Sequence, residues 1–117
     1  MGNATMCREV VLSFVGNPQV AKGLFNGSVT ATLRARRFAE AGDVIHARNL
    51  ALNLVIDSVT PMPVCDAATL HYQALGFHTP ASFLNEWRAL HPHHPSVSRI
   101  AYLYRFHRSD KPRERSL

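Results

Sequence analysis

Long apolar stretches are missing from this chain of 117 residues. The longest apolar-rich runs, residues 10–15 and 50–56, fall far short of the roughly 20 residues that a membrane-spanning helix needs. The amino-terminal region also lacks the basic start, sustained apolar stretch and small-residue cleavage site of a secretory signal. We therefore expect a cytoplasmic protein with no membrane partner.

Cysteine is scarce as well. Cys7 and Cys65 stand far apart and form no CxxC pair, which argues against a disulfide framework and against a thiolate zinc site. Three histidines, His91, His93 and His94, lie close together, but the prolines among them hold the segment extended, whereas zinc needs side chains that converge on one point. We expect no metal and no cofactor.

Lysine is rare among the basic residues: Lys22 and Lys111 are two of thirteen, and the rest are arginines. The formal net charge is +5, and guanidinium groups bind phosphate through two parallel hydrogen bonds. With 46% hydrophobic and 18% charged residues, the chain has the composition of a folded domain. We expect RNA or another nucleic acid as the partner, with an acidic protein as the alternative and the oligomeric state left open.

The most informative segment runs from Gly27 to Arg37. If residues 29–36 form a strand, its side chains alternate between two faces, one apolar and one polar. The polar face then carries Thr30, Thr32, Arg34 and Arg36, with Arg37 beside it. Such a face is suited to binding phosphate or a polar base, although an ordinary half-buried strand with a solvated outer face shows the same alternation.

Apolar periodicity and turn residues predict the remaining elements. We expect strands over 9–15, 29–36, 44–48, 49–60 and 100–107, and helices over 18–25, 67–75 and 80–90. Asn17, Asp66 and Thr79 are the expected helix caps, and Pro61-Met62-Pro63 is expected to end the fourth strand. Short connections and a majority of strands predict an α+β fold with a strongly curved sheet or a small barrel.

Aromatic side chains alternate along the last expected strand. Tyr102, Tyr104 and Phe106 share one face, where they could stack nucleic-acid bases, but packing in the core is the favoured interpretation because a barrel needs large apolar groups. Trp87 is expected to anchor the last helix to the sheet in the same way.

Two blocks of residues are similar to the ASCH domain, the activating-signal-cointegrator homology branch of the PUA-like superfold. The first is Gly27-x-x-x-x-Thr32-x-Arg34 followed by Gly42-Asp43. The second runs from Leu75-Gly76-Phe77-His78-Thr79-Pro80 through Phe83-Leu84, Trp87 and Leu90-His91-Pro92 to a closing strand that ends in Phe106. Together they cover residues 9–107.

This resemblance implies a small mixed β-barrel with two to three flanking helices and a cleft beside the Thr/Arg strand for a nucleotide or RNA. Some members of the family resemble amidohydrolases that remove the acetyl group of N4-acetylcytidine with a lysine, a threonine and a glutamate. Others are associated with RNA binding or RNA cleavage. Fold alone does not choose among these roles.

The catalytic residues of such a hydrolase carry over only in part. The threonine falls on Thr32 and the motif arginine on Arg34, but Val29 stands where the family has its lysine, and Leu75 or Gly76 where a glutamate is expected. A valine cannot activate water or stabilise an oxyanion. Thr32 would be catalytic only in an enzyme, either a nucleoside amidohydrolase or a ribonuclease.

The resulting hypothesis is an RNA-binding ASCH-like domain over residues 1–107 with a basic, disordered tail over 108–117. Thr30, Thr32, Arg34, Arg36 and Arg37 are its expected nucleic-acid-binding residues. The alternatives are an amidohydrolase acting on N4-acetylcytidine or a related acylated nucleoside, and a protein-interaction module.

Overall fold

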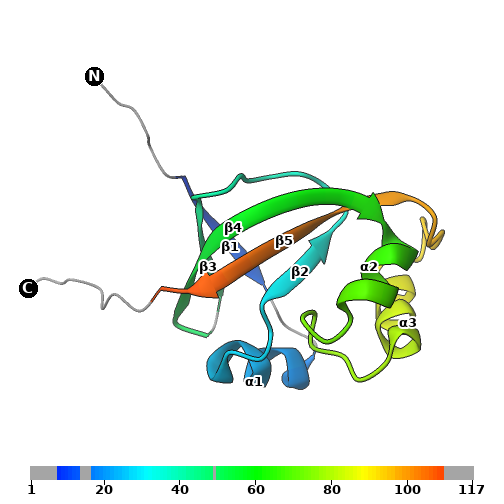
Figure 1. Ribbon diagram of the computed structural model, residues 1–117, viewed down its shortest axis with the longest axis horizontal. Helices are drawn as coiled ribbons and strands as arrows, with labels where there is room; N and C mark the ends of the chain where they lie inside the picture. Colours follow the sequence, from blue (N-terminus) through cyan, green and yellow to red (C-terminus); the bar gives the residue numbers. More distant parts are fainter. Residues whose placement is uncertain (1–7, 14–16, 49, 110–117) are drawn as a thin grey trace, which may run out of the picture.

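The computed structural model describes residues 8–13, 17–48 and 50–109, which form one mixed sheet with three helices beside it (Figure 1). The strands are β1 (Glu9–Ser13), β2 (Ala31–Arg34), β3 (Val44–Arg48), β4 (Leu52–Pro63) and β5 (Ile100–Arg108); the helices are α1 (Pro18–Asn26), α2 (Val64–His71) and α3 (Pro80–Leu90). The strand order is β1-β3-β4-β5-β2, with β1 parallel to β3 and the other neighbouring pairs antiparallel. This half-barrel confirms the expected α+β fold.

Some expectations fall outside these ranges: residues 14–15 of the first strand, Asn49, Cys7 and the chain beyond residue 109. None of the helices in the described part of the chain has the length and apolar character that crossing a membrane requires.

Strand β4 is the long curved ribbon that crosses the whole molecule in Figure 1. Its first four residues pair with β3, and it pairs with β5 over almost its full length. The register shifts between Ile56 and Ser58, and a bulge of this kind increases the local bend and twist of a strand. On one side of this bend β4 pairs with both β3 and β5, and on the other side it continues along β5.

The sequence places the last residue of this strand at Thr60, before two prolines, but β4 runs through both prolines and ends at Pro63. Pro61 pairs with Tyr102 and Pro63 with Ile100, both inside the ladder to β5. Proline is tolerated there because, beyond Ile56, β5 is the strand that β4 pairs with in the described sheet, so the missing N–H groups can face away from that ladder.

Two clusters of buried side chains make up the core. The first lies around β3, β4 and the end of β5, and the second lies between β2, α2 and α3. Strand β5 serves both, since Tyr104 and Phe106 belong to the first and Ala101 and Leu103 to the second. Core packing is therefore the correct interpretation of the aromatic strand, and Trp87, 2% exposed, anchors α3 as expected.

Helices α1 and α3 begin as their sequences predict. The Asn17 side chain accepts hydrogen bonds from the N–H groups of Gln19 and Val20, and α1 ends at Gly27, whose φ of 86° is easily adopted only by glycine. Thr79 and Ser82 form a reciprocal capping box at the start of α3. Both starts therefore have the chemistry that helix caps require.

Helix α2 differs from the expectation, because it covers Val64–His71 and Asp66 is not its cap. The chain passes from β4 directly into the helix. The N–H groups of Val64 and Cys65 donate to the carbonyl oxygens of Arg99 and Val97. Backbone groups thus satisfy donors of the first turn that a capping side chain would otherwise satisfy.

Strand β2 is shorter than the expected 29–36, since the chain bends after Arg34. The buried Tyr104 hydroxyl accepts a hydrogen bond from the Phe38 N–H at 2.7 Å and donates one to the Arg36 carbonyl oxygen at 3.1 Å. The Phe38 ring also stacks on Tyr104 with centroids 4.5 Å apart. These contacts hold the chain away from the strand direction, so Arg36 does not continue the polar face of β2.

Arg108 is the last residue of β5 rather than the first of a tail. Its guanidinium donates to the carbonyl oxygen of Phe25 in the last turn of α1, where cations are favoured by the helix dipole. The neighbouring Ser109 N–H donates to the Asn53 carbonyl oxygen. Residues 108 and 109 are therefore both bonded to the rest of the described structure.

Candidate functional site

A pocket of about 360 Å³ lies along the outer edge of β2, between this strand and helices α1 and α3. Strand β2 ends the sheet order, so this edge faces no other strand among the described residues. The apolar side chains of the lining include Val20, Leu75, Phe77, Phe83, Trp87 and Leu90. Its polar side chains are Ser13, Asn17, Thr32, Arg34, Glu86 and His91. The cavity has the mixed character typical of small-ligand sites.

Thr32 and Arg34 lie on the same face of β2, two residues apart, and both line the pocket. The Arg34 Nε–H donates to the Thr32 hydroxyl oxygen at 3.1 Å, and Nη2 donates to the Ser13 carbonyl oxygen at 3.3 Å. Arg34 therefore links β2 to the end of β1 across the opening of the half-barrel. Burial lowers the pKa of this guanidinium from its usual value, but an arginine remains charged at neutral pH.

Helix α3 supplies the opposite side through Phe83, Glu86, Trp87 and Leu90, which are spaced to share one helical face. Glu86 is a functional candidate that the sequence analysis did not identify. The signal was present, because a carboxylate three residues after Phe83 and four before Leu90 falls within an otherwise apolar stripe. Its carboxylate makes no hydrogen bond or ion pair with any other described residue.

Trp87 and His91 form a stacked pair at the end of α3, with ring centroids 3.9 Å apart. His91 Nδ1 lies 2.9 Å from the Trp87 carbonyl oxygen. Because a carbonyl only accepts, Nδ1 carries the proton, and Nε2 of the neutral imidazole is an acceptor. The buried indole Nε1 of Trp87 has no hydrogen-bond partner within the described chain.

The other predicted site residues lie away from this lining. Thr30 is half-buried, and its carbonyl oxygen accepts from the Phe106 N–H at the start of the β2–β5 ladder. Arg36 and Arg37 are exposed and follow Ala35, which does line the pocket. The structure thus brings Thr32 and Arg34 together at the cavity and leaves the two further arginines beyond the end of β2.

The position of the family lysine is occupied by a core residue. Val29 is 4% exposed and packs in the first core cluster, where one of its methyl groups would lie 2.3 Å from a Cβ built on Gly23 and 2.9 Å from one built on Gly76. Both glycines leave room for this valine. No lysine of the described residues lines the pocket.

Metal-ligand groups are not assembled in the described ranges: no three His, Cys, Asp or Glu side chains come together there. His93 and His94 are exposed, whereas His91 lines the pocket, with its ring stacked on Trp87 and hydrogen-bonded to the Trp87 carbonyl oxygen.

Comparison with known proteins identifies the fold. No family model matches the sequence, and no curated protein matches it. Among solved structures, an ASCH domain from Lactobacillus crispatus superposes with a TM-score of 0.68 at 13% identity, covering 86% of this chain and 79% of that one. A protein from Enterococcus faecalis gives a TM-score of 0.62 at 17% identity over 97% and 88% of the two chains.

A mutant of the ASCH protein from Zymomonas mobilis also matches, with a TM-score of 0.56 at 15% identity over 86% of this chain and 69% of that one. The chain therefore has an ASCH-like fold, as the two sequence blocks predict. At these identities the likeness concerns the fold, and the function has to be argued from the pocket.

Proposed function

We propose that this protein binds single-stranded RNA and accepts one nucleotide in the pocket beside β2. The observation that carries the proposal is that aromatic side chains and polar or charged side chains line the same cavity. Phe77, which is half-buried, and Phe83 and Trp87, which are 6% and 2% exposed, form the aromatic wall, while Thr32 and Arg34 supply a hydroxyl and a positive charge. A nucleotide needs both, because its base is flat and apolar on its faces and its phosphate is anionic.

The size of the cavity favours a single unpaired nucleotide over a duplex. A volume of about 360 Å³ is within the range of small-molecule sites, and a base can enter it only if it is unstacked from its neighbours. The exposed Arg36 and Arg37 follow the pocket residue Ala35 and would meet the phosphates of neighbouring nucleotides. The formal net charge of +5 also favours an anionic partner such as RNA.

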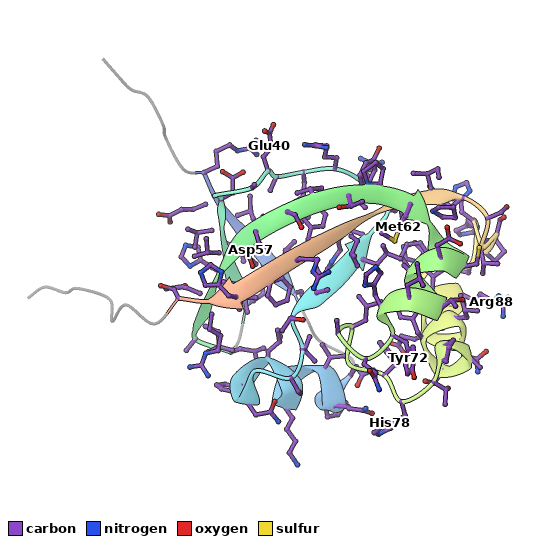
Figure 2. The ribbon with its side chains drawn as sticks, in the orientation of Figure 1. Glu40, Asp57, Met62, Tyr72, His78 and Arg88 are labelled. Atoms are coloured by element: carbon purple, nitrogen blue, oxygen red, sulfur yellow. The ribbon has the colours of Figure 1, made fainter. Side chains whose placement is uncertain are left out.

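Fluorescence anisotropy with labelled single-stranded RNA over a range of salt concentrations tests the proposal. Removing both Arg36 and Arg37 should weaken binding of all sequences and reduce the salt slope by up to about 1.4, at about 0.7 per lost phosphate contact. Arg88→Ala is the control for loss of an arginine away from the pocket, because Figure 2 shows Arg88 on the outer side of α3, directed away from the sheet. Absence of binding at low salt would rule the proposal out.

The pocket also gives some support to a second function, hydrolysis of an acylated nucleoside. Thr32 and the Glu86 carboxylate line the same cavity, so α3 supplies a glutamate that was not expected there. The His91 ring also lines this cavity, whereas the lysine of the family's hydrolases has no counterpart in the lining. Acetate release from N4-acetylcytidine that Thr32→Ala abolishes would favour this function; no release above background would exclude it for this substrate.

A further inference from the structure

The outer edge of β2 presents backbone groups to the pocket as well as side chains. The Phe106 N–H donates to the Thr30 carbonyl oxygen, so the backbone of Thr30 faces β5 at that point. Opposed residues of antiparallel strands alternate between bonded and non-bonded pairs, so Thr32 and Arg34 bond to β5 as well. The residues between them, Ala31 and Leu33, then direct their N–H and C=O groups to the outer edge.

The prolines of β4 support this assignment independently. Pro61 opposes Tyr102 in the β4–β5 ladder and has no N–H to donate. Tyr102 therefore belongs to a non-bonded pair with β4 and turns its backbone groups to β2, where it opposes Arg34. The Ala31 N–H, on the outer edge, donates to the Ala74 carbonyl oxygen.

Leu33 is the residue whose outer backbone groups remain available at the pocket. It lines the cavity, and neither its N–H nor its C=O bonds to another described residue on that edge. A peptide edge of this kind offers one donor beside one acceptor, the pattern that the hydrogen-bonding edge of a base can match. The Glu86 carboxylate adds a second acceptor to the same cavity, and it accepts from no described residue.

We propose that the pocket selects a base with an exocyclic amino group, cytosine or adenine, through the Leu33 peptide edge and the Glu86 carboxylate. The ring nitrogen of either base accepts from the Leu33 N–H. The base donates one amino hydrogen to the Leu33 carbonyl oxygen and the other to the Glu86 carboxylate. Both acceptors of the pocket and its one backbone donor, the Leu33 N–H, are then used. Uracil has a carbonyl oxygen where these bases have the amino group and would bring that oxygen against the carboxylate. This inference rests on the proposed binding of RNA.

The test measures the affinities of short labelled oligomers of cytidine, adenosine and uridine for the full chain. Hydrogen bonds to a charged group contribute about 1.5–3 kcal/mol, so we expect cytidine or adenosine oligomers to bind roughly tenfold or more tightly than uridine oligomers. Glu86→Gln supplies an N–H donor as well as an acceptor and should reduce this preference to about threefold or less on the same grounds. Glu40→Gln is the matched control, because Glu40 lies in the loop between β2 and β3, well away from α3 (Figure 2).

A backbone variant tests the Leu33 edge without altering any side chain. Replacing Leu33 by its α-hydroxy acid converts the Thr32–Leu33 amide to an ester. This removes the Leu33 N–H and keeps the Leu33 carbonyl oxygen, while the Thr32 carbonyl oxygen, which faces β5, becomes a weaker acceptor. We expect the affinity for cytidine and adenosine oligomers to fall roughly fivefold or more, as loss of a hydrogen bond worth about 1 kcal/mol requires. Equal affinity for all three oligomers, or a preference that both variants preserve, overturns the inference and leaves RNA binding standing. Failure of every oligomer to bind overturns both proposals.

Discussion

Replacing Tyr104 by phenylalanine is the sharpest structural test of how the end of β2 is held. Tyr104 is fully buried, and its hydroxyl joins two backbone groups of the segment that follows β2. The substitution keeps the ring and its stacking on Phe38 but leaves the Phe38 N–H and the Arg36 carbonyl oxygen without this partner. Two hydrogen bonds are lost in one step.

The magnitude follows from those two groups. A buried polar group that loses its partner costs about 1–3 kcal/mol, and both bonds here are partly buried, so values near the lower end apply. We expect Tyr104→Phe to reduce the free energy of unfolding by about 2–3 kcal/mol. The loss should also loosen the segment that carries Arg36 and Arg37, and thereby weaken RNA binding.

Urea denaturation followed by circular dichroism measures the change, with Tyr102→Phe as the matched control. Tyr102 lies two residues away on the same strand, is half-buried, and its hydroxyl bonds to no described residue, so its loss should cost no more than about 0.5 kcal/mol. If the two variants unfold at the same urea concentration, the hydroxyl of Tyr104 does not hold this segment and the reasoning fails.

Three further predictions concern the same scaffold. Gly23→Ala places a Cβ 2.3 Å from a methyl group of Val29, and overpacking of this kind should cost about 1–3 kcal/mol in thermal or chemical unfolding. Val29→Lys, which restores the family lysine by sequence, should destabilise the protein and yield no acetate from N4-acetylcytidine, because the position is in the core. Hydrogen bonds from the backbone N–H of Glu40, and then of Arg8, hold the pKa of the Asp43 carboxyl below its usual value. The ionised Asp43 carboxylate therefore stabilises the fold fully above the ordinary aspartate pKa of about 4, and this stabilisation is lost as the pH falls through the lowered pKa of Asp43. The difference in unfolding free energy between wild type and Asp43→Asn should therefore become smaller in acid.

The fold was predictable where local chemistry determines it. The caps Asn17 and Thr79 and the strand Val44–Arg48 lie where the sequence places them, because caps and short apolar alternations act over a few residues. The predictions were wrong where contacts with segments far away in the sequence determine the local structure. Asp66 does not cap α2, because the backbone of residues 97–99 bonds to the first turn of this helix. The prolines of β4 are accommodated because, among the described residues, that part of β4 pairs with β5 alone.

The candidate site was predictable only on its strand side. Alternation placed Thr32 and Arg34 on one face, but it could not show that Tyr104, some seventy residues further along the chain, turns Arg36 out of the strand. Glu86 was overlooked because a single carboxylate on an apolar helix stripe becomes informative only when the helix is seen to face a cavity. The orientation of the Leu33 peptide depends on the β2–β5 register, which a single sequence does not contain.

The intrinsic fluorescence of Trp87 gives the most direct measurement of whether the pocket receives a nucleotide. Trp87 is the single tryptophan of the chain and lines the pocket, so all tryptophan emission comes from a wall of this cavity. Titration with single-stranded RNA at low salt should quench the emission saturably, with Thr32→Val shifting the midpoint to higher RNA concentration and Arg88→Ala leaving it in place. Emission that stays unchanged while anisotropy reports bound RNA would show that RNA binds elsewhere on the protein, and would contradict the account.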